Sequence, residues 1–242
     1  MAQNGPPTEY AALIGDVVGS REAINRRRLH DLVRSALEEV NAHLPSVQSL
    51  SPTVGDEFQA VYQELPAAVH ATLLLRLSLA GAAEVRFGIG WGPLEVFEAS
   101  ELPFQQDGPA WWAARDAIER VSATMKQKEG PRGLRTACLF SAPDEAGPQQ
   151  PSGAGGLTAQ GHQAILNGFL MCRDEIVAGM DERDARITLA LLRNKRQRTI
   201  AKEENISQSA VAQRISRSGA YALVNAHESL IEGTKWSSLE SG

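Results

Sequence analysis

The sequence predicts a ferredoxin-like α/β domain followed by an all-α domain that contains a helix-turn-helix. Three observations lead to this prediction. Over the first 140 residues, apolar runs of strand length alternate with helically spaced segments in the order β-α-β-β-α-β. Residues 141–156 consist mostly of Pro, Gly, Ser and Gln, a composition typical of a linker. Residues 157–242 then have helical spacing.

Local patterns predict the individual elements. Short apolar runs predict strands over residues 10–17, 50–54, 57–62, 84–91 and 134–140. Apolar residues three or four positions apart predict helices over residues 21–43, 66–80, 109–128 and 157–180, and three or four shorter ones up to about residue 231. Ser20 is the expected cap of the first helix, and Gly55-Asp56 is the expected hairpin turn. The expected domains are therefore residues 1–140 and 157–242, and a fragment from Leu157 onward is expected to fold alone.

The composition narrows the class of protein. The chain has 242 residues, 43% of them hydrophobic and 22% charged, and contains two cysteines. No run of eighteen apolar residues suggests a membrane span, and the first residues do not resemble a secretory signal. Cys138 and Cys172 have no His or Cys neighbours at metal-ligand spacing, which argues against a zinc site. Two reduced thiols predict a cytoplasmic protein without a membrane partner.

The net charge of −5 hides a strong asymmetry. Nine Lys and Arg residues stand against three Asp and Glu residues between Arg183 and Arg217, a local charge of +6. The rest of the chain is therefore strongly acidic. This division indicates a basic module attached to an acidic domain.

The basic segment has the spacing of a helix-turn-helix, within residues 181–231. Ala201 is a small residue where two helices cross, Asn205 tolerates a positive φ at the turn, and Val211 anchors the second helix. Ser207 is a suitable cap for that helix. Double-stranded DNA is the predicted partner, and the residues expected to contact it are Arg196, Arg198, Ser207, Gln208, Ser209, Gln213, Arg214 and Arg217. Two alternatives remain open: a helical hairpin with a solvated basic face, and a module that binds a protein such as a sigma factor. The segment resembles sigma-like and response-regulator helix-turn-helix domains, in which both uses occur.

Two acidic motifs mark a candidate site in the first domain. Asp16 ends the first strand, and Asp56 lies in the predicted hairpin. On adjacent strands they would face each other and repel unless a proton or a cation such as Mg²⁺ lay between them. Residues Val18 to Arg21 lead into the predicted helix, where backbone amides can hold a phosphate. The alternative without a functional site is that both aspartates are turn or cap residues.

These motifs resemble the metal-binding motifs of class III nucleotidyl cyclases and are similar to the GGDEF domain. The segment 86–93, RFGIGWGP, is similar to a further cyclase strand, although its glycines are equally explained by close packing or a bulge. The resemblance implies a palm-like fold, a metal set of Asp16, Val17 and Asp56, and a nucleotide or phosphate set of Val18, Gly19, Ser20, Arg21 and Arg115. Arg115 has an alternative role, an ion pair with Glu119 on its own helix.

The whole chain resembles the SatD family of bacterial proteins. The shared segments are GDVVGSR (15–21), GDEF (55–58), DGPAWWAAR (107–115) and the terminal helix-turn-helix. The resemblance carries no established activity. The chain also departs from the cyclases where those enzymes read the sugar and base: Trp111 replaces an asparagine, Pro52 replaces a lysine, and residues 104–106 lack an aspartate. The resemblance therefore implies that the metal- and phosphate-binding residues of the cyclases are kept, whereas a base would be recognised differently.

Three functions follow as hypotheses. The favoured one is a DNA-binding transcriptional regulator whose cyclase-like domain senses a nucleotide or another phosphorylated ligand. The alternative is a Mg²⁺-dependent cyclase or related phosphotransfer enzyme that the helix-turn-helix targets. A scaffold that only dimerises is the third. We expect a homodimer, with one of the adjacent Trp111 and Trp112 in the core and the other in a pocket or an interface.

Overall fold

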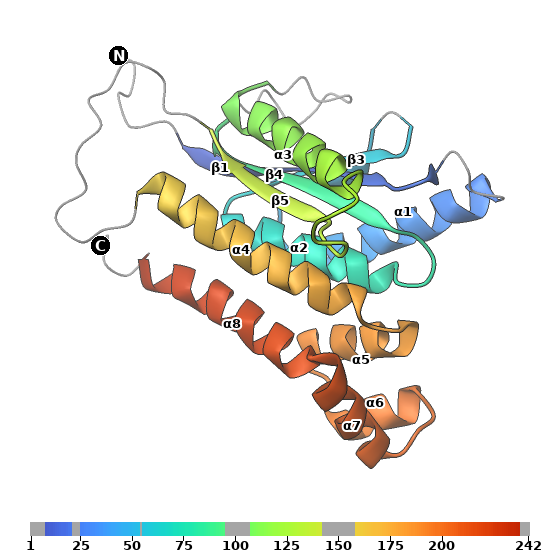
Figure 1. The fold of residues 1–242 in the computed structure, drawn as a ribbon. Coiled ribbons are helices and arrows are strands. Elements are labelled where there is room, and N and C mark those ends of the chain that lie inside the picture. The colour runs from blue at the N-terminus through green and yellow to red at the C-terminus, as the bar shows by residue number, and fades with distance from the viewer. Residues whose placement is uncertain (1–7, 21–24, 54, 95–106, 142–157, 238–242) are drawn as a thin grey trace.

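The computed structural model describes residues 8–20, 25–53, 55–94, 107–141 and 158–237. Five strands form one sheet in the order β2-β3-β1-β4-β5 (Figure 1). They are β1 (Glu9–Val17), β2 (Gln48–Pro52), β3 (Glu57–Tyr62), β4 (Val85–Pro93) and β5 (Thr136–Phe140). The first four pair antiparallel, and β5 joins the edge parallel to β4. The predicted ferredoxin-like order is confirmed.

Helices cover both faces of this sheet (Figure 1). Helix α3 lies on one face and α1 and α2 lie on the other, while α4 runs along the outer edge of β5, where Asn167 and Gln163 hydrogen-bond the strand backbone. The helices are α1 (Arg26–His43), α2 (Leu65–Ser78), α3 (Pro109–Met125), α4 (Ala159–Ala178), α5 (Glu182–Leu192), α6 (Gln197–Glu203), α7 (Gln208–Ser218) and α8 (Ala220–Ser237). None of the helices in these described ranges combines the length and apolar character that a membrane crossing requires.

The start of α1 differs from the prediction. Ser20 is not its cap; the helix begins at Arg26, and the side chain of Asn25 accepts a hydrogen bond from the Arg28 amide. The hydroxyl of Ser20 instead donates to the carboxylate of Asp56. A short polar side chain can cap any nearby amide, and the apolar periodicity alone does not define which one begins the helix.

Two glycines permit the closest contacts around β1 and β4. A Cβ atom at Gly90 would lie 1.9 Å from the carbonyl oxygen of Ala110, so α3 packs with its backbone directly on β4. A Cβ atom at Gly15 would lie 2.3 Å from the Phe58 ring. Of the two explanations for the glycines of β4, close packing is therefore the one the structure supports. Gly15 serves packing in the same way.

The C-terminal helices share a core with the α/β part. Buried Leu170 and Leu223, from α4 and α8, belong to the same apolar cluster as Leu73 of α2 and Leu13 of β1. The sequence predicts an independent fold for residues from Leu157 onward, but this common core argues against it, since the fragment would expose the apolar faces of α4 and α8. The predicted linker, apart from Ser141, lies outside the described residues, and the domain boundaries stay a prediction.

A buried ionic cluster joins these parts. Asp174 of α4 is fully buried and forms ion pairs with Arg76 of α2 at 2.9 Å and with Arg173 at 2.8 Å. Its second carboxylate oxygen accepts the backbone amides of Arg135 and Thr136, both at 2.7 Å. A buried charge needs this degree of pairing, because desolvation of an unpaired ion is costly. The cluster therefore fixes α4 against β5 and α2.

Candidate functional site

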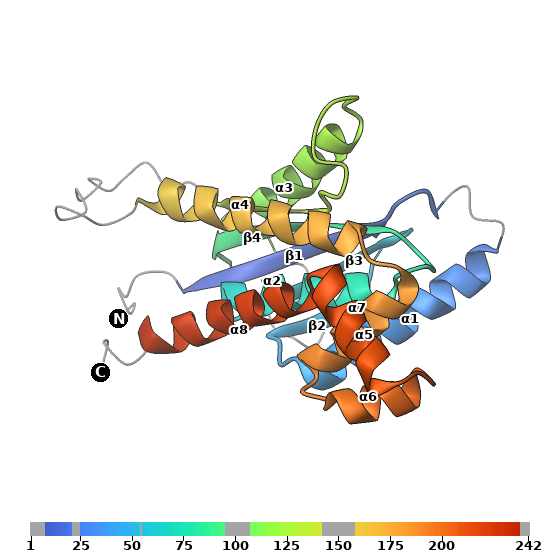
Figure 2. The ribbon, with the colours of Figure 1, turned by 60° about the horizontal axis from the view of Figure 1, so that its bottom comes forward.

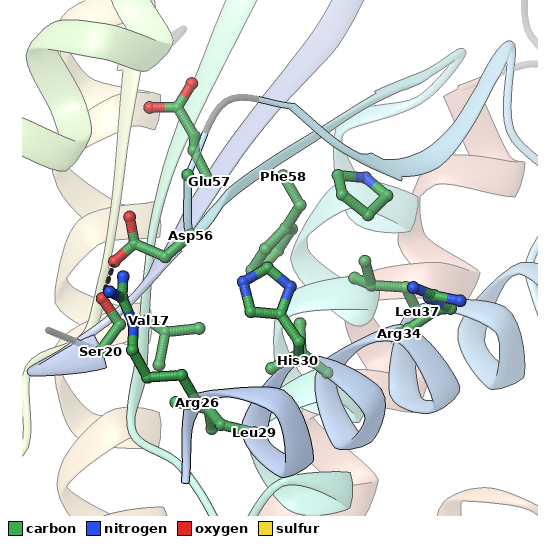
Figure 3. Close-up of a pocket in the computed structure, with 13 residues that line it drawn as sticks. Val17, Ser20, Arg26, Leu29, His30, Arg34, Leu37, Asp56, Glu57 and Phe58 are labelled. Atoms are coloured by element: carbon green, nitrogen blue, oxygen red, sulfur yellow. Dashed lines mark hydrogen bonds between the residues drawn. The ribbon is translucent and has the colours of Figure 1, made fainter. Parts of the chain in front are cut away.

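A cavity of about 110 Å³ lies between α1 and the β2–β3 hairpin (Figure 3). Apolar side chains form much of its wall, among them Leu29, Val33, Leu37 and Phe58. Arg26, His30 and Arg34 line it from successive turns of α1. Ser20 and Asp56, two residues of the predicted site, line it from the opposite side and are hydrogen-bonded to each other. The cavity therefore combines an apolar wall with cationic and polar groups.

Asp16 lies on the other face of the sheet. Its carboxylate accepts two hydrogen bonds from the guanidinium of Arg86, at 2.7 and 2.6 Å. Arg86 also donates to the hydroxyl of Ser122 on α3, at 2.9 Å. This fork-like pairing is the strongest geometry available to an Arg and a carboxylate. The structure therefore gives Asp16 a guanidinium partner and does not bring it into the cavity that Asp56 lines.

A second ion pair lies beside the first. Glu57 is the register partner of Asp16 on the neighbouring strand. Its carboxylate accepts hydrogen bonds from Arg115 of α3 at 2.6 and 2.9 Å. These bonds raise the pKa of the Arg115 guanidinium above its ordinary value. From the sequence, Arg115 was expected to contact either a phosphate or the carboxylate of Glu119. In the structure its partner is the carboxylate of Glu57.

The residues present do not fit a Mg²⁺ ion shared by Asp16 and Asp56. Each carboxylate already has its own partner, Arg86 for Asp16 and Ser20 for Asp56. Within the described ranges, no group of three or more His, Cys, Asp or Glu side chains is placed to hold a metal. Val17 lines the α1 cavity, with its side chain in the core. The predicted metal set is therefore divided between two faces of the sheet.

The predicted phosphate loop is only partly described. Arg21 lies outside the described residues. The amide of Val18 donates to the carbonyl of Glu84 at 2.8 Å, so it is not directed at a ligand. Gly19 has a positive φ of 70°. Among the described residues of this set, Ser20 alone lines the cavity.

Helices α6 and α7 have the predicted geometry. Ala201 and Val211 are buried in one apolar cluster with Ile200 and Ile215. Asn205, in the turn, has a φ of 53°, and the Ser207 hydroxyl accepts the amide of Ala210 as the cap of α7. Figure 1 shows α6 and α7 beyond α5, away from the sheet, and in Figure 2 α6 lies at the bottom of the molecule. The outward-facing exposed residues of α7 are Gln208, Ser209, Ala212, Gln213, Ser216 and Arg217, and Ser207 is exposed at its start.

Ion pairs within the helices reduce the basic charge of this region. Arg214 donates hydrogen bonds to the carboxylates of Asp181 and Asp184, at 2.8 and 2.6 Å. Its charge is therefore paired within the protein. These bonds lower the pKa of Asp181. Arg217 is 70% exposed and lies 3.7 Å from Asp184. Arg196, Arg198 and Lys202 are exposed and have no acidic partner among the described residues. The cationic surface is thus concentrated on α6 and at the end of α7.

The comparison with protein families gives one match. The model of the SatD family matches residues 10–129, from β1 to just beyond α3. The chain belongs to the SatD family. No curated protein sequence matches it. The family match covers the cavity, both ion pairs and the whole of α3 of this SatD protein, and it ends before β5.

Solved structures resemble the SatD protein in fold. A bacterial light-regulated adenylyl cyclase has 13% identity and a TM-score of 0.41, over 55% of this chain and 77% of the cyclase. The guanylyl cyclase Cya2 has 13% identity and a TM-score of 0.38, over 53% and 82% of the two chains. An EAL/GGDEF domain protein from M. capsulatus has 17% identity and a TM-score of 0.38, over 58% and 88%. At these values the likeness is one of fold alone.

Sequence reasoning missed the basic side of the cavity in this SatD protein. Arg26, His30 and Arg34 recur every four residues, so they share one face of a helix. Leu29 and Val33 stand one position before His30 and Arg34, and Leu37 continues the same spacing of four. These two spacings together predict a helix face with an apolar stripe beside a row of basic side chains, and they could have indicated the cavity wall. Arg86 gave a weaker signal, because only strand register places it beside Asp16.

Proposed function

We propose that this SatD protein is a DNA-binding transcriptional regulator whose α/β domain binds a nucleotide or another phosphorylated ligand. The observation that carries the DNA-binding role is the outer face of α7. Gln208, Ser209 and Gln213 are exposed there, and their side chains are able to donate to and accept from base edges. Two free thiols, Cys138 and Cys172, support a cytoplasmic location.

The cations around α7 support contacts with the DNA backbone. Arg198 and Lys202 border a shallow hollow between α6 and α7, together with Ser207 and Gln208. Arg217 lies at the far end of α7 and is largely exposed. In helix-turn-helix proteins, such cations meet phosphates on both sides of the groove that the second helix enters. Arg214, by contrast, is expected to stabilise the module rather than to contact DNA.

Mutations of phosphate-contacting and base-contacting residues should have different effects on DNA binding. With a duplex enriched from a random pool by the full-length chain, Arg198→Ala and Arg217→Ala should weaken binding to every sequence. Each should also reduce the slope of log K against log salt by about one unit. Gln208→Ala and Gln213→Ala should cost about 1–3 kcal/mol on the preferred duplex and little on others. Fluorescence anisotropy at several salt concentrations measures both effects.

Arg120→Ala is the matched control, because it removes the same charge from the exposed side of α3. If Arg120→Ala and Arg217→Ala weakened DNA binding equally, the loss would be due to the change in net charge and not to a contact made by Arg217. The absence of salt-dependent DNA binding by the full-length chain would mean that α6 and α7 form a protein-binding module or a solvated hairpin, and the regulator proposal would then be wrong.

A homodimer forms part of the proposal. Trp111 is buried, whereas Trp112 is 61% exposed and donates to Asp107 at 2.9 Å. A large exposed aromatic side chain is a typical centre of an interface. Light scattering at tens of micromolar should give twice the chain mass, and Trp112→Ser should shift the protein to monomer. Leu32→Ser, which removes another exposed apolar side chain, should not. A monomeric wild-type protein contradicts this prediction.

The pairing of the two aspartates argues against the phosphotransfer alternative. In-line attack assisted by Mg²⁺ needs carboxylates free to hold the ion next to the phosphates. Asp16 is bound in a fork by Arg86, and Asp56 lies on the other face with Ser20. Ligand binding without turnover is therefore the better account of the α/β domain.

A further inference from the structure

We infer that the cavity between α1 and the β2–β3 hairpin binds a small phosphate ester with an apolar group, and that arginines rather than a metal ion neutralise its charge. The inference rests on the proposed ligand-binding role of the α/β domain and names the ligand class and its place. Size, wall composition and charge each support one part of it.

The size of the cavity limits the group that it can enclose. Pockets for drug-sized ligands have volumes of roughly 300–1,000 Å³. The cavity here has about 110 Å³, so it encloses a group no larger than a single ring or a short acyl chain. A whole nucleotide would extend beyond its mouth. The ligand therefore has one small buried part and a part at the rim.

The wall of the cavity suits an apolar buried part. Leu37 and Phe58 are almost completely buried beneath it, and Leu29 and Val33 are partly buried. The ring of Phe58 passes over Gly15, which leaves it in contact with the sheet. Burial of an apolar ring against these side chains contributes roughly 25 cal/mol for each Å² removed from water. A purely inorganic anion would gain none of this.

The charges around the rim favour an anion. Arg26 extends from the end near Ser20 and Asp56, Arg34 lies at the opposite end near Leu37, and His30 lies between them (Figure 3). Guanidinium groups bind phosphate oxygens in a fork geometry and keep their charge at any physiological pH. Asp56 is the acidic side chain on the other side of the cavity, and Ser20 already donates to it.

The remaining carboxylates near the hairpin do not counter these cations. Glu57 also borders the cavity, but its side chain is directed away from it (Figure 3) and its oxygens are bound by Arg115. Asp16 is on the far face with Arg86. Among the described residues that line the cavity, Arg26 and Arg34 outweigh Asp56, so the charge there is positive without a metal ion. An anion is therefore attracted directly.

Thermal unfolding of the full-length chain in EDTA tests the inference, with phenyl phosphate, inorganic phosphate and phenol as probes. A ligand that binds the folded state raises the melting temperature in a saturable way. Phenyl phosphate should do so, inorganic phosphate should bind more weakly, and phenol should have no effect. The double variant Arg26→Gln/Arg34→Gln should weaken the apparent affinity about tenfold or more, the range expected for lost hydrogen bonds to a charged group.

The control variant is Arg27→Gln/Arg28→Gln, which makes the same change in charge on the same helix, outside the cavity wall. It should change the affinity less than twofold. Asp56→Asn should leave binding unchanged or tighten it, because it removes a negative charge. Three results would overturn the inference: no saturable shift with phenyl phosphate, equal losses in the two double variants, or a shift that requires Mg²⁺ and disappears in Asp56→Asn. None of them bears on DNA binding by α7, which the anisotropy experiment tests separately.

Discussion

Replacement of Asp174 by Asn is expected to lower the free energy of unfolding by about 3–5 kcal/mol, the cost of leaving a buried charge without its partner. Asp174 neutralises part of the charge of Arg76 and Arg173, and all three are buried. The amide of Asn would offer one acceptor oxygen where the carboxylate now serves two arginines and two backbone amides. The guanidinium groups of Arg76 and Arg173 would then be buried without the carboxylate that now balances their charge.

Urea denaturation followed by circular dichroism measures this loss. The control is Asp116→Asn, the same substitution at an exposed position of α3, which should change the stability by no more than about 0.5 kcal/mol. A loss at Asp174 equal to that at Asp116 would contradict the buried cluster. Because Asp174 connects α4 to β5 and α2, limited proteolysis should also cleave α4 earlier in the variant.

Acid should destabilise the protein through His227. This side chain is buried in α8, its ring lies 5.7 Å from His70 of α2 and 5.4 Å from Phe169 of α4, and neither ring nitrogen has a hydrogen-bond partner among the described residues. Burial, aided by the charge of Arg173, lowers the pKa of His227 from 6.5 to about 2. The unfolded chain therefore binds a proton below pH 6.5 that the folded chain does not bind.

The stability should be complete above pH 6.5 and fall as the pH decreases, because the unfolded state then holds more protons. At about 1.4 kcal/mol per pH unit, the contribution of His227 between pH 6.5 and 4.5 is about 2–3 kcal/mol. His227→Leu should remove this part of the pH dependence, whereas His162→Leu, at an exposed position of α4, should leave it in place. Urea denaturation at several pH values measures the difference, and parallel curves for His227→Leu and the wild type would contradict it.

The sequence predicted the elements better than the relation between them. The strand over 57–62 is as predicted, and the spacing of Ala201, Asn205 and Val211 predicted the turn between α6 and α7 correctly, since each depends on neighbouring residues alone. The common core of α4 and α8 with the sheet was not predictable in the same way. Helical spacing shows that a helix has an apolar face, but it does not show which element covers that face.

In the structure, strand register gives the two aspartates of the candidate site different surroundings. The expectation that Asp16 and Asp56 face each other rested on the topology, which places the end of the first strand beside the hairpin of the next two. In the sheet, Asp16 is opposite Glu57, one residue beyond Asp56. Side chains alternate between faces along a strand, so a difference of one residue sends a side chain to the opposite side of the sheet. Glu57 thus meets α3, and Asp56 turns to the cavity beside α1.

The contact between α2 and α8 has a consequence for the synthesis of the chain. About 140 residues separate the two helices, which a ribosome takes roughly 7–28 s to add at 5–20 residues per second. During this interval the face of α2 that carries His70 and receives Leu223 has no cover from α8. A nascent chain with such a surface is prone to associate with other chains. Slower translation of the segment between α2 and α8 would therefore lengthen the period in which this face of the nascent chain is open to association.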